Sequence, residues 1–279
     1  MNMRAELAKL GNLDQNAIPL FETALWFAAL GHPGRGLDPY RTHLKNLVQK
    51  LEKKHQDACA AGADDTPEER VKSLRSVMFD DESYSGDSDN YNDLRNADMM
   101  EVIDRRKGMP IALALLAIEL GRAQGWGVQG ISFPGHFLVR MDGDGVRLMC
   151  DPFDKLKILQ APDLRALLKK VFGEKAELSS TYYVEASNRD ILLRLQNNIK
   201  FRQIEDEEYQ SALATIENMR LIAPDEYRLL LDDGVVKARL GRVSEAIESV
   251  RGYIHKVPDM RYRAEAESFL LSLEQSSDR

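Results

Sequence analysis

The sequence predicts an α+β fold that is mainly helical, with a small antiparallel sheet and helical repeats in its C-terminal third. Residues 111–120, IALALLAIEL, are apolar on nearly every face, as in a helix that is buried all round. Residues 128–153 have the pattern of a β-hairpin around Asp142-Gly143-Asp144-Gly145. Beyond residue 200, similar residues recur 34 positions apart. These three observations together favour helices packed on a sheet, followed by repeats.

Composition narrows the class of protein. The chain has 279 residues and a net charge of -7, which argues against a general nucleic-acid binder because phosphate requires a positive field. Cys59 and Cys150 are far apart and lack CxxC spacing, as expected of a protein in a reducing compartment. The N-terminal residues lack an apolar signal-peptide core, and no apolar run is long enough to span a membrane. We therefore expect a cytoplasmic protein.

Helices are predicted over the first hundred residues. Apolar residues at helical spacing fill 17–30 before the breakers Gly31 and Pro33, and Leu44 to Leu51 continue the period in a second helix. We expect a loop from Cys59 to residue 65. Thr66 has the position of an N-cap, with Glu69 completing a capping box. Residues 80–93 are acidic and rich in turn formers, which predicts a loop, and 97–105 predict a short helix.

The hairpin fixes which side chains share a face. A turn at Gly143-Asp144 would pair His136 directly with Asp151, whereas a turn at Asp144-Gly145 moves the pairing by two residues and preserves the faces. One face then carries the apolar residues Phe137, Val139, Met141, Val146, Leu148 and Cys150, and is expected to be core. The other face carries His136, Leu138, Arg140, Arg147, Met149 and Asp151.

The C-terminal repeat has the period of tetratricopeptide units. Ala212 recurs as Ala246, and Ala223-Pro224-Asp225 recurs as Val257-Pro258-Asp259. The first unit is degenerate, with Lys200 and Glu207 where the second has Gly234 and Gly241. Residues 263–273 would form a terminal helix that covers the end of the stack.

A buried helix followed by a hairpin with His and Asp is the layout of a thiol acyl-transfer site. The nucleophile of such a site lies at the helix N-terminus, where the helix dipole favours a thiolate. Here Gly108 to Leu113 contain no Cys, Ser or Thr. Cys150 is predicted to point to the opposite face from His136, and nothing connects the Cys59 loop to His136. Thiol catalysis therefore lacks its first component.

The motif order resembles one family. Four segments, in this order, resemble the SirB-type transglutaminase-like proteins of bacteria. They are Asn96, the run Arg105-Arg106-Lys107-Gly108-Met109-Pro110-Ile111-Ala112-Leu113, the run Phe133-Pro134-Gly135-His136-Phe137-Leu138-Val139-Arg140, and Asp151-Pro152-Phe153. The resemblance implies a papain-like core followed by tetratricopeptide-type helices. Active transglutaminase-like proteins open the central helix with Gly-x-Cys, and Gly108-Met109-Pro110 has proline in place of that cysteine. The SirB-type branch is similar in lacking it.

The predicted organisation has three parts: a helical region over 1–108, a transglutaminase-like core over 109–185, and repeats over 186–279. We expect a non-catalytic interaction or scaffold protein, a pseudoenzyme that binds a protein or peptide through a cleft or through the repeats. The alternative is a cysteine-independent hydrolase or amide and acyl transferase that uses His136 and Asp151. This pair is a structural contact, a remnant dyad that lines a groove, or an acid–base pair that activates water. The residues expected to line the cleft are Asn96, Arg106, Pro110, Phe137 and Arg140.

No cofactor or metal is expected. Asp87, Asp89 and Asp93 lack the glycine and glutamate spacing of an EF-hand, so a solvated acidic loop is the simpler interpretation. The basic trio Arg105-Arg106-Lys107 is interpreted in the same way, as a solvated helix end.

Overall fold

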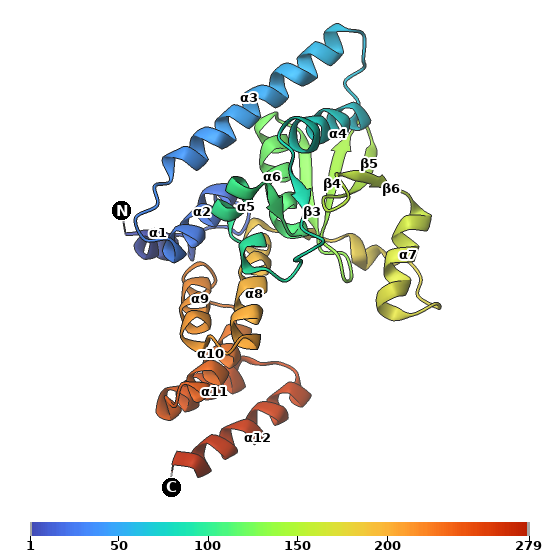
Figure 1. Cartoon of the computed structure of the whole chain (residues 1–279). Helices are drawn as coiled ribbons and strands as arrows, with labels where there is room; N and C mark the ends of the chain where they lie inside the picture. The colour runs from blue at the N-terminus through green and yellow to red at the C-terminus, as the bar shows by residue number, and fades with distance from the viewer. Residues whose placement is uncertain (1, 278–279) are drawn as a thin grey trace. The chain divides into compact units, whose positions relative to one another are not determined.

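The computed structural model describes residues 2–277 and divides into two compact units (Figure 1). One unit spans Gln15–Leu195, and the other combines Met1–Asp14 with Gln196–Arg279. The helices and strands confirm the predicted α+β, mainly helical class. The helices of the larger unit are α2 (Leu20–Gly31), α3 (Asp38–Ala60), α4 (Pro67–Arg75), a π-helix (Ser76–Asp81), α5 (Met99–Arg105), α6 (Pro110–Ala123), α7 (Ala161–Phe172) and the start of α8 (Asn188–Glu205), with 3-10 turns at Leu94–Asn96 and Ser180–Tyr183.

The main sheet has five strands in the order β6-β5-β4-β3-β7, and every neighbouring pair is antiparallel. Its strands are β3 (Gly127–Ile131), β4 (Leu138–Gly143), β5 (Val146–Asp151), β6 (Lys157–Leu159) and β7 (Glu185–Ala186). Two further short strands, β1 (Ser85–Gly86) and β2 (Lys107–Gly108), form a separate parallel pair. The sequence indicated only the hairpin of β4 and β5.

The hairpin takes the second of the two registers considered. Gly143 pairs with Val146, so the turn is Asp144-Gly145, and both turn residues have positive φ. That conformation suits a two-residue turn between twisted strands. Direct pairing of His136 with Asp151 is therefore wrong, because the register lies two residues further along and His136 precedes β4.

Helix α6 is the centre of the larger unit, beside β3 and β4 (Figure 1). Residues 111–118 are all at most 2% exposed, as the apolar sequence predicted. Gly121 allows the close approach of β3, because a Cβ at this position would lie 2.5 Å from Cγ2 of Val128. Helix and sheet thus form one continuous core.

The second face of the hairpin is also buried over much of its length, which the alternation of the sequence did not indicate. Leu138 and Met149 form an apolar cluster with Leu164 and Leu168 of α7, while Val146 of the supposed core face is 40% exposed. The alternation rule assumes one covered face, and α7 covers the other.

The N-cap predicted for the helix before the π-helix is confirmed, but the capping box is not, because the N–H of Thr66 donates to the carbonyl of Asp64 and not to Glu69. The Thr66 side chain accepts a hydrogen bond from the N–H of Glu69, and Pro67 is the first residue of α4. The loop predicted from Cys59 starts later, because α3 continues to Ala60.

The smaller unit contains α1 (Met3–Leu10), the end of α8, α9 (Tyr209–Ile222), α10 (Arg228–Arg239), α11 (Val243–Lys256) and α12 (Met260–Ser277). Its repeat-related residues Ala212 and Ala246 are both fully buried. The degenerate positions keep the backbone of the repeat: Glu207 has φ +59° where Gly241 has +74°. Lys200, in the place of Gly234, is 2% exposed and forms an ion pair with Asp232 at 2.5 Å.

Candidate functional site

His136 is placed by a tight turn that its own sequence specifies. The N–H of His136 donates to the carbonyl of Phe133 at 3.0 Å, which closes the turn Phe133-Pro134-Gly135-His136. Proline suits the second position of a type II turn, and the third requires positive φ, which Gly135 has at +69°. The imidazole therefore follows a rigid bend immediately before β4.

Arg194 of α8 is next to this turn. Its Nη2 donates to the carbonyl of His136 at 3.3 Å, and its guanidinium lies 5.2 Å from the ring centre of Phe137. Phe137 is buried against Gly130, where a Cβ would meet its ring at 2.6 Å. The ring and the guanidinium together fix the backbone that carries His136.

Asp151 ends β5 and caps the following turn. Its Oδ1 accepts hydrogen bonds from the N–H groups of Phe153 at 2.8 Å and Asp154 at 3.4 Å. Within residues 2–277, neither Oδ2 of Asp151 nor the imidazole of His136 makes a side-chain hydrogen bond. The two residues interact electrostatically without a direct hydrogen bond between them.

Burial lowers the pKa of His136, and it outweighs the opposing effect of Asp151; Lys170 and Arg194 lower the pKa further. His136 is therefore neutral near pH 7, with one ring nitrogen that accepts and one that donates. Both His136 and Asp151 are half-buried. Together they offer unused donors and acceptors, the chemistry needed to bind a polar group or orient a water molecule.

The loop after Asp151 connects this pair to the start of α6. Phe153 packs against β1, where a Cβ on Gly86 would lie 2.5 Å from its ring, and Tyr91 meets the same ring edge-on with centroids 5.7 Å apart. Gly86 pairs with Gly108 of β2, two residues before α6 begins at Pro110. The predicted dyad and helix start thus belong to one connected region.

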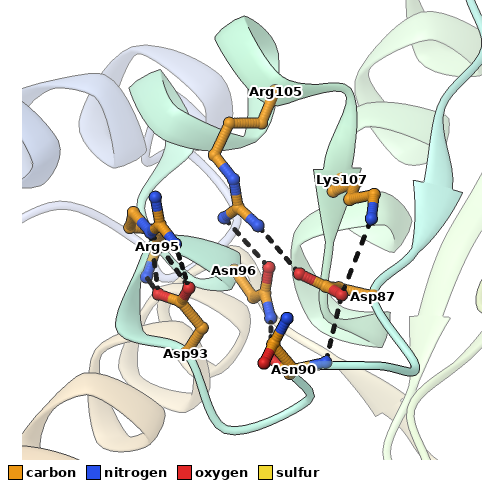
Figure 2. Close-up of polar contacts among 7 residues, drawn as sticks. All are labelled: Asp87, Asn90, Asp93, Arg95, Asn96, Arg105 and Lys107. Atoms are coloured by element: carbon orange, nitrogen blue, oxygen red, sulfur yellow. Dashed lines mark hydrogen bonds and ion pairs between the residues drawn. The ribbon is translucent and has the colours of Figure 1, made fainter.

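A buried polar network holds the chain before α6 (Figure 2). Asp87 is 2% exposed and accepts from Arg105 at 2.8 Å and from the N–H of Asn90 at 3.2 Å, with Lys107 4.0 Å away. Asn96, which is fully buried, accepts from Arg105 at 3.2 Å and donates to the carbonyl of Asn90 at 2.7 Å. Burial alone would raise the pKa of Asp87, but the hydrogen bonds from Asn90 and Arg105 and the charge of Lys107 hold it below its usual range.

Two interpretations from the sequence are therefore wrong. Asp87 is not part of a solvated acidic loop, because its carboxylate is buried, and Arg105 is not a solvated helix end, because it is partly buried and paired with Asp87. The carbonyl of Asn96 also accepts from the N–H of Met109 at 3.0 Å. The network consequently fixes the residues that precede the central helix.

The thiols are poorly placed for nucleophilic chemistry. Cys150 is 1% exposed, and burial, with the charge of Asp151, raises its pKa to about 12. Cys59 lies in α3 with its sulfur 3.8 Å from Nε2 of His55. That same nitrogen contacts Asp65 at 3.0 Å, and Nδ1 contacts Ser73 at 3.3 Å. Because a proton shared with Asp65 occupies Nε2, His55 cannot also accept the thiol proton there.

The expected cleft residues separate into three places. Asn96, Pro110 and Phe137 belong to the connected region described above. Arg106, with a left-handed backbone at φ +58°, instead lines a hollow of about 410 Å³ with Tyr40 and His43. Arg140 is 6% exposed and forms ion pairs with Asp142 at 2.7 Å and Glu185 at 2.5 Å.

No local sequence pattern indicated Arg194 or the aromatic pair of Tyr91 and Phe153. Arg194 comes from a helix far along the chain, so no local pattern indicates it. The one sequence feature that could have indicated the pairing of Asp87 is the complementary charge of two nearby segments: residues 80–93 are acidic, and residues 105–107 are basic. Among the described residues, no group of three or more His, Cys, Asp or Glu side chains is arranged to hold a metal ion. Over residues 2–277, no helix is both long and apolar enough to cross a membrane.

Fold and site define a transglutaminase-like core joined to tetratricopeptide helices. Residues 38–197 match the transglutaminase-like superfamily, and residues 199–270 match a tetratricopeptide repeat family. The chain therefore belongs to the transglutaminase-like superfamily, and its resemblance to the SirB-type branch is confirmed.

Its relatives include proteins named UPF0162. The chain is 34% identical to one from Pseudomonas aeruginosa over 69% of this chain and 68% of the relative. It is 29% identical to another from Xylella fastidiosa, over 89% of this chain and 88% of that protein. The human F-box only protein 21 is 25% identical over 58% of this chain, a stretch that makes up 26% of the human protein.

Proposed function

We propose that this chain is a non-catalytic binding protein of the cytoplasm, a pseudoenzyme that recognises a protein or peptide segment. Two features carry the proposal. Pro110 begins α6, at the position where the family resemblance implies a cysteine in active members, and His136 and Asp151 retain unused hydrogen-bonding groups. A site that keeps its polar groups without a nucleophile is suited to recognition. The tetratricopeptide helices, a class that presents extended surfaces to partners, support the same proposal.

The partner's chemistry follows from the groups present. A neutral imidazole and a carboxylate oxygen complement a segment with both donors and acceptors, such as peptide backbone. Tyr91, 45% exposed beside Phe153, adds an aromatic surface for an apolar side chain. The human relative contains a similar stretch within a longer protein, which is consistent with a module that is combined with other domains.

The test is affinity capture with the full chain, followed by direct titration of each purified candidate. His136→Ala should weaken binding about fivefold or more, since leaving a buried polar group without its hydrogen bond costs roughly 1–3 kcal/mol. Glu174→Gln, on an exposed residue after α7, is the matched control. Tyr262→Ala tests the repeat unit, where that side chain is 49% exposed. Absence of any directly binding partner, or binding unchanged in both test variants, would refute the proposal.

A second candidate is a cysteine-independent hydrolase or acyl transferase. It is favoured by the neutral state of His136, which suits a general base, and by the charge of Asp151 nearby. No hydrogen bond joins the two side chains, so Asp151 would act on His136 through its charge alone. Amide, ester and glutaminyl substrates should be screened with wild type and His136→Ala. Turnover that is equal in the two proteins would remove this candidate, whereas a loss of about 100-fold or more would favour it over simple binding.

A further inference from the structure

A second polar site lies in the same unit, away from the residues that define the first. A hollow of about 590 Å³ is lined by side chains from the segment before α2 and from α6, β3, β7 and α8. This volume is in the range of small-molecule sites. The lining residues are Gln15, Asn16, Arg122, Gln129, Glu185, Ala186, Ser187 and Asp190.

Arg122 is the central cation of this hollow, and it is held rigidly. Its Nε donates to the carbonyl of Val128 at 2.9 Å, Nη1 to Oδ1 of Asn188 at 2.7 Å and Nη2 to Oε1 of Gln129 at 2.7 Å. All three acceptors are neutral oxygens. A guanidinium has five N–H groups, so two have no protein acceptor among residues 2–277.

Arg122 also lacks a counter-ion within the described part of the chain. No carboxylate of the described chain lies within ion-pair distance of it; the nearest electrostatic influences are Glu119 and Glu185, at longer range. Burial lowers the pKa of Arg122, although the group stays charged. A half-buried guanidinium with fixed geometry and free donors is the arrangement that binds a carboxylate in two-point fashion.

The opposite charge lies at the rim of the hollow. Asp190 is exposed, and its Oδ2 accepts from the N–H and hydroxyl of Ser187 at 3.1 and 2.6 Å. Its Oδ1 has no hydrogen bond and its carboxylate no cationic partner among residues 2–277. Glu185 adds a second carboxylate, which is paired with Arg140. With two carboxylates around one guanidinium, a polyanion such as a nucleotide is repelled.

We propose that this hollow binds a small zwitterion of the α-amino acid type, either a free amino acid or a short peptide. The ligand carboxylate meets the open N–H groups of Arg122, and its ammonium lies toward Asp190 and Glu185. Gln129 and Asn16 supply neutral amides at the walls. The proposal is independent of the function assigned to His136.

Calorimetry on the full wild-type chain tests this, with the twenty amino acids and their glycyl dipeptides as individual probes up to millimolar concentration. We expect saturable binding for at least one probe. Converting the carboxylate of that probe to an amide should weaken binding by about tenfold or more, because a charge-assisted hydrogen-bond pair is lost. N-acetylation should weaken binding less, since the rim carboxylates are exposed. Tighter binding of dipeptides than of amino acids would identify a peptide as the natural source.

Protein variants give the complementary measurement. Arg122→Gln should reduce the affinity of the best probe about tenfold or more. Asp190→Asn, which preserves an acceptor for Ser187, should reduce it less, and Glu174→Gln and His136→Ala should not change it. The proposal is overturned if no probe binds, or if the amide derivative binds as well as the free acid. These two outcomes use wild-type protein, so they hold even where Arg122→Gln fails to fold.

Discussion

The network around Asp87 and the pair His136–Asp151 lie in one region but differ in how their polar groups are used. In the network, both Asp87 and Asn96 have bonded partners on nearly every polar atom, and both side chains are buried. In the pair, Asp151 uses one oxygen for its own turn, and His136 makes no side-chain hydrogen bond within the described residues. The polar groups of the network are hydrogen-bonded within the fold, whereas those of the pair include donors and acceptors that remain open.

The difference separates stability from recognition. A satisfied buried network fixes conformation, and removing a member leaves charges without partners. A half-exposed pair with open hydrogen-bonding groups contributes little to the free energy of folding. Its open groups are therefore better explained by binding than by stability. Substitutions in the two places should therefore affect different measurements.

The largest effect is expected for Asp87→Ala. It leaves Arg105, whose side chain is 20% exposed, without its carboxylate partner. Breaking a fully buried pair typically costs about 3–5 kcal/mol, so we expect a loss at the lower end of this range. Urea unfolding followed by circular dichroism measures the loss. Asp87→Asn is the matched variant, because it keeps an acceptor for the N–H of Asn90 and should lose less. A free energy of unfolding within about 0.5 kcal/mol of wild type for Asp87→Ala would mean that the network is not structural.

Gly86→Ala tests the contact that joins the two regions. Its Cβ would lie 2.5 Å from the ring of Phe153, and overpacking of this kind costs about 1–3 kcal/mol. The same urea titration should show less than additive loss in the double variant Gly86→Ala, Phe153→Leu, because the smaller side chain relieves the clash. Strict additivity would show that Gly86 and Phe153 are not coupled.

Gly135→Ala should cost about 1–2 kcal/mol through the left-handed backbone of the turn, at φ +69°. Gly135→Asn is a useful comparison, because asparagine tolerates this conformation while adding the same Cβ. Thermal unfolding should rank alanine below asparagine. If the two variants unfold alike, the closeness of Val171 to the new Cβ, rather than backbone strain, sets the cost.

His136→Gln should change stability least, by about 0.5 kcal/mol or less near pH 7.5. Because burial lowers the pKa of His136 in the folded state, the unfolded chain binds more protons as pH falls below about 6.5. Wild type therefore loses stability as the pH falls through this range, and the variant should lose less. Urea midpoints at about pH 7.5 and about pH 5.5 measure this. An unchanged dependence on pH would contradict the assignment; His43, whose pKa burial also lowers, contributes separately.

Local sequence signals predicted much of the fold. The capping role of Thr66, the buried central helix and the 34-residue repeat each depend on contacts close in sequence or on a repeated pattern. The turn around Gly135 is also local in sequence, but the hairpin pattern placed His136 within the strand, whereas it closes the turn that precedes β4.

Long-range contacts account for what the sequence did not predict. The cover of α7 on the second sheet face, the ion pair of Asp87 with Arg105 and the approach of Arg194 all join residues from separate elements. Periodicity shows that one face of a strand is apolar, but not whether another element covers the opposite face. The sequence also left two registers open for the hairpin of β4 and β5, because both place the same residues on each face.

The parallel pairing of β1 with β2 closes a loop of the chain at its base, with residues 87–106 between the paired ends. Closing a longer loop adds only about 0.6 kcal/mol of entropy for each doubling in length, once the ends are held. Chain entropy therefore does not set the tolerance of this loop to insertions; the hydrogen bonds inside it do. An insertion at the exposed Ser88 would separate Asp87 from Asn90 and should be poorly tolerated, although the residue itself faces solvent.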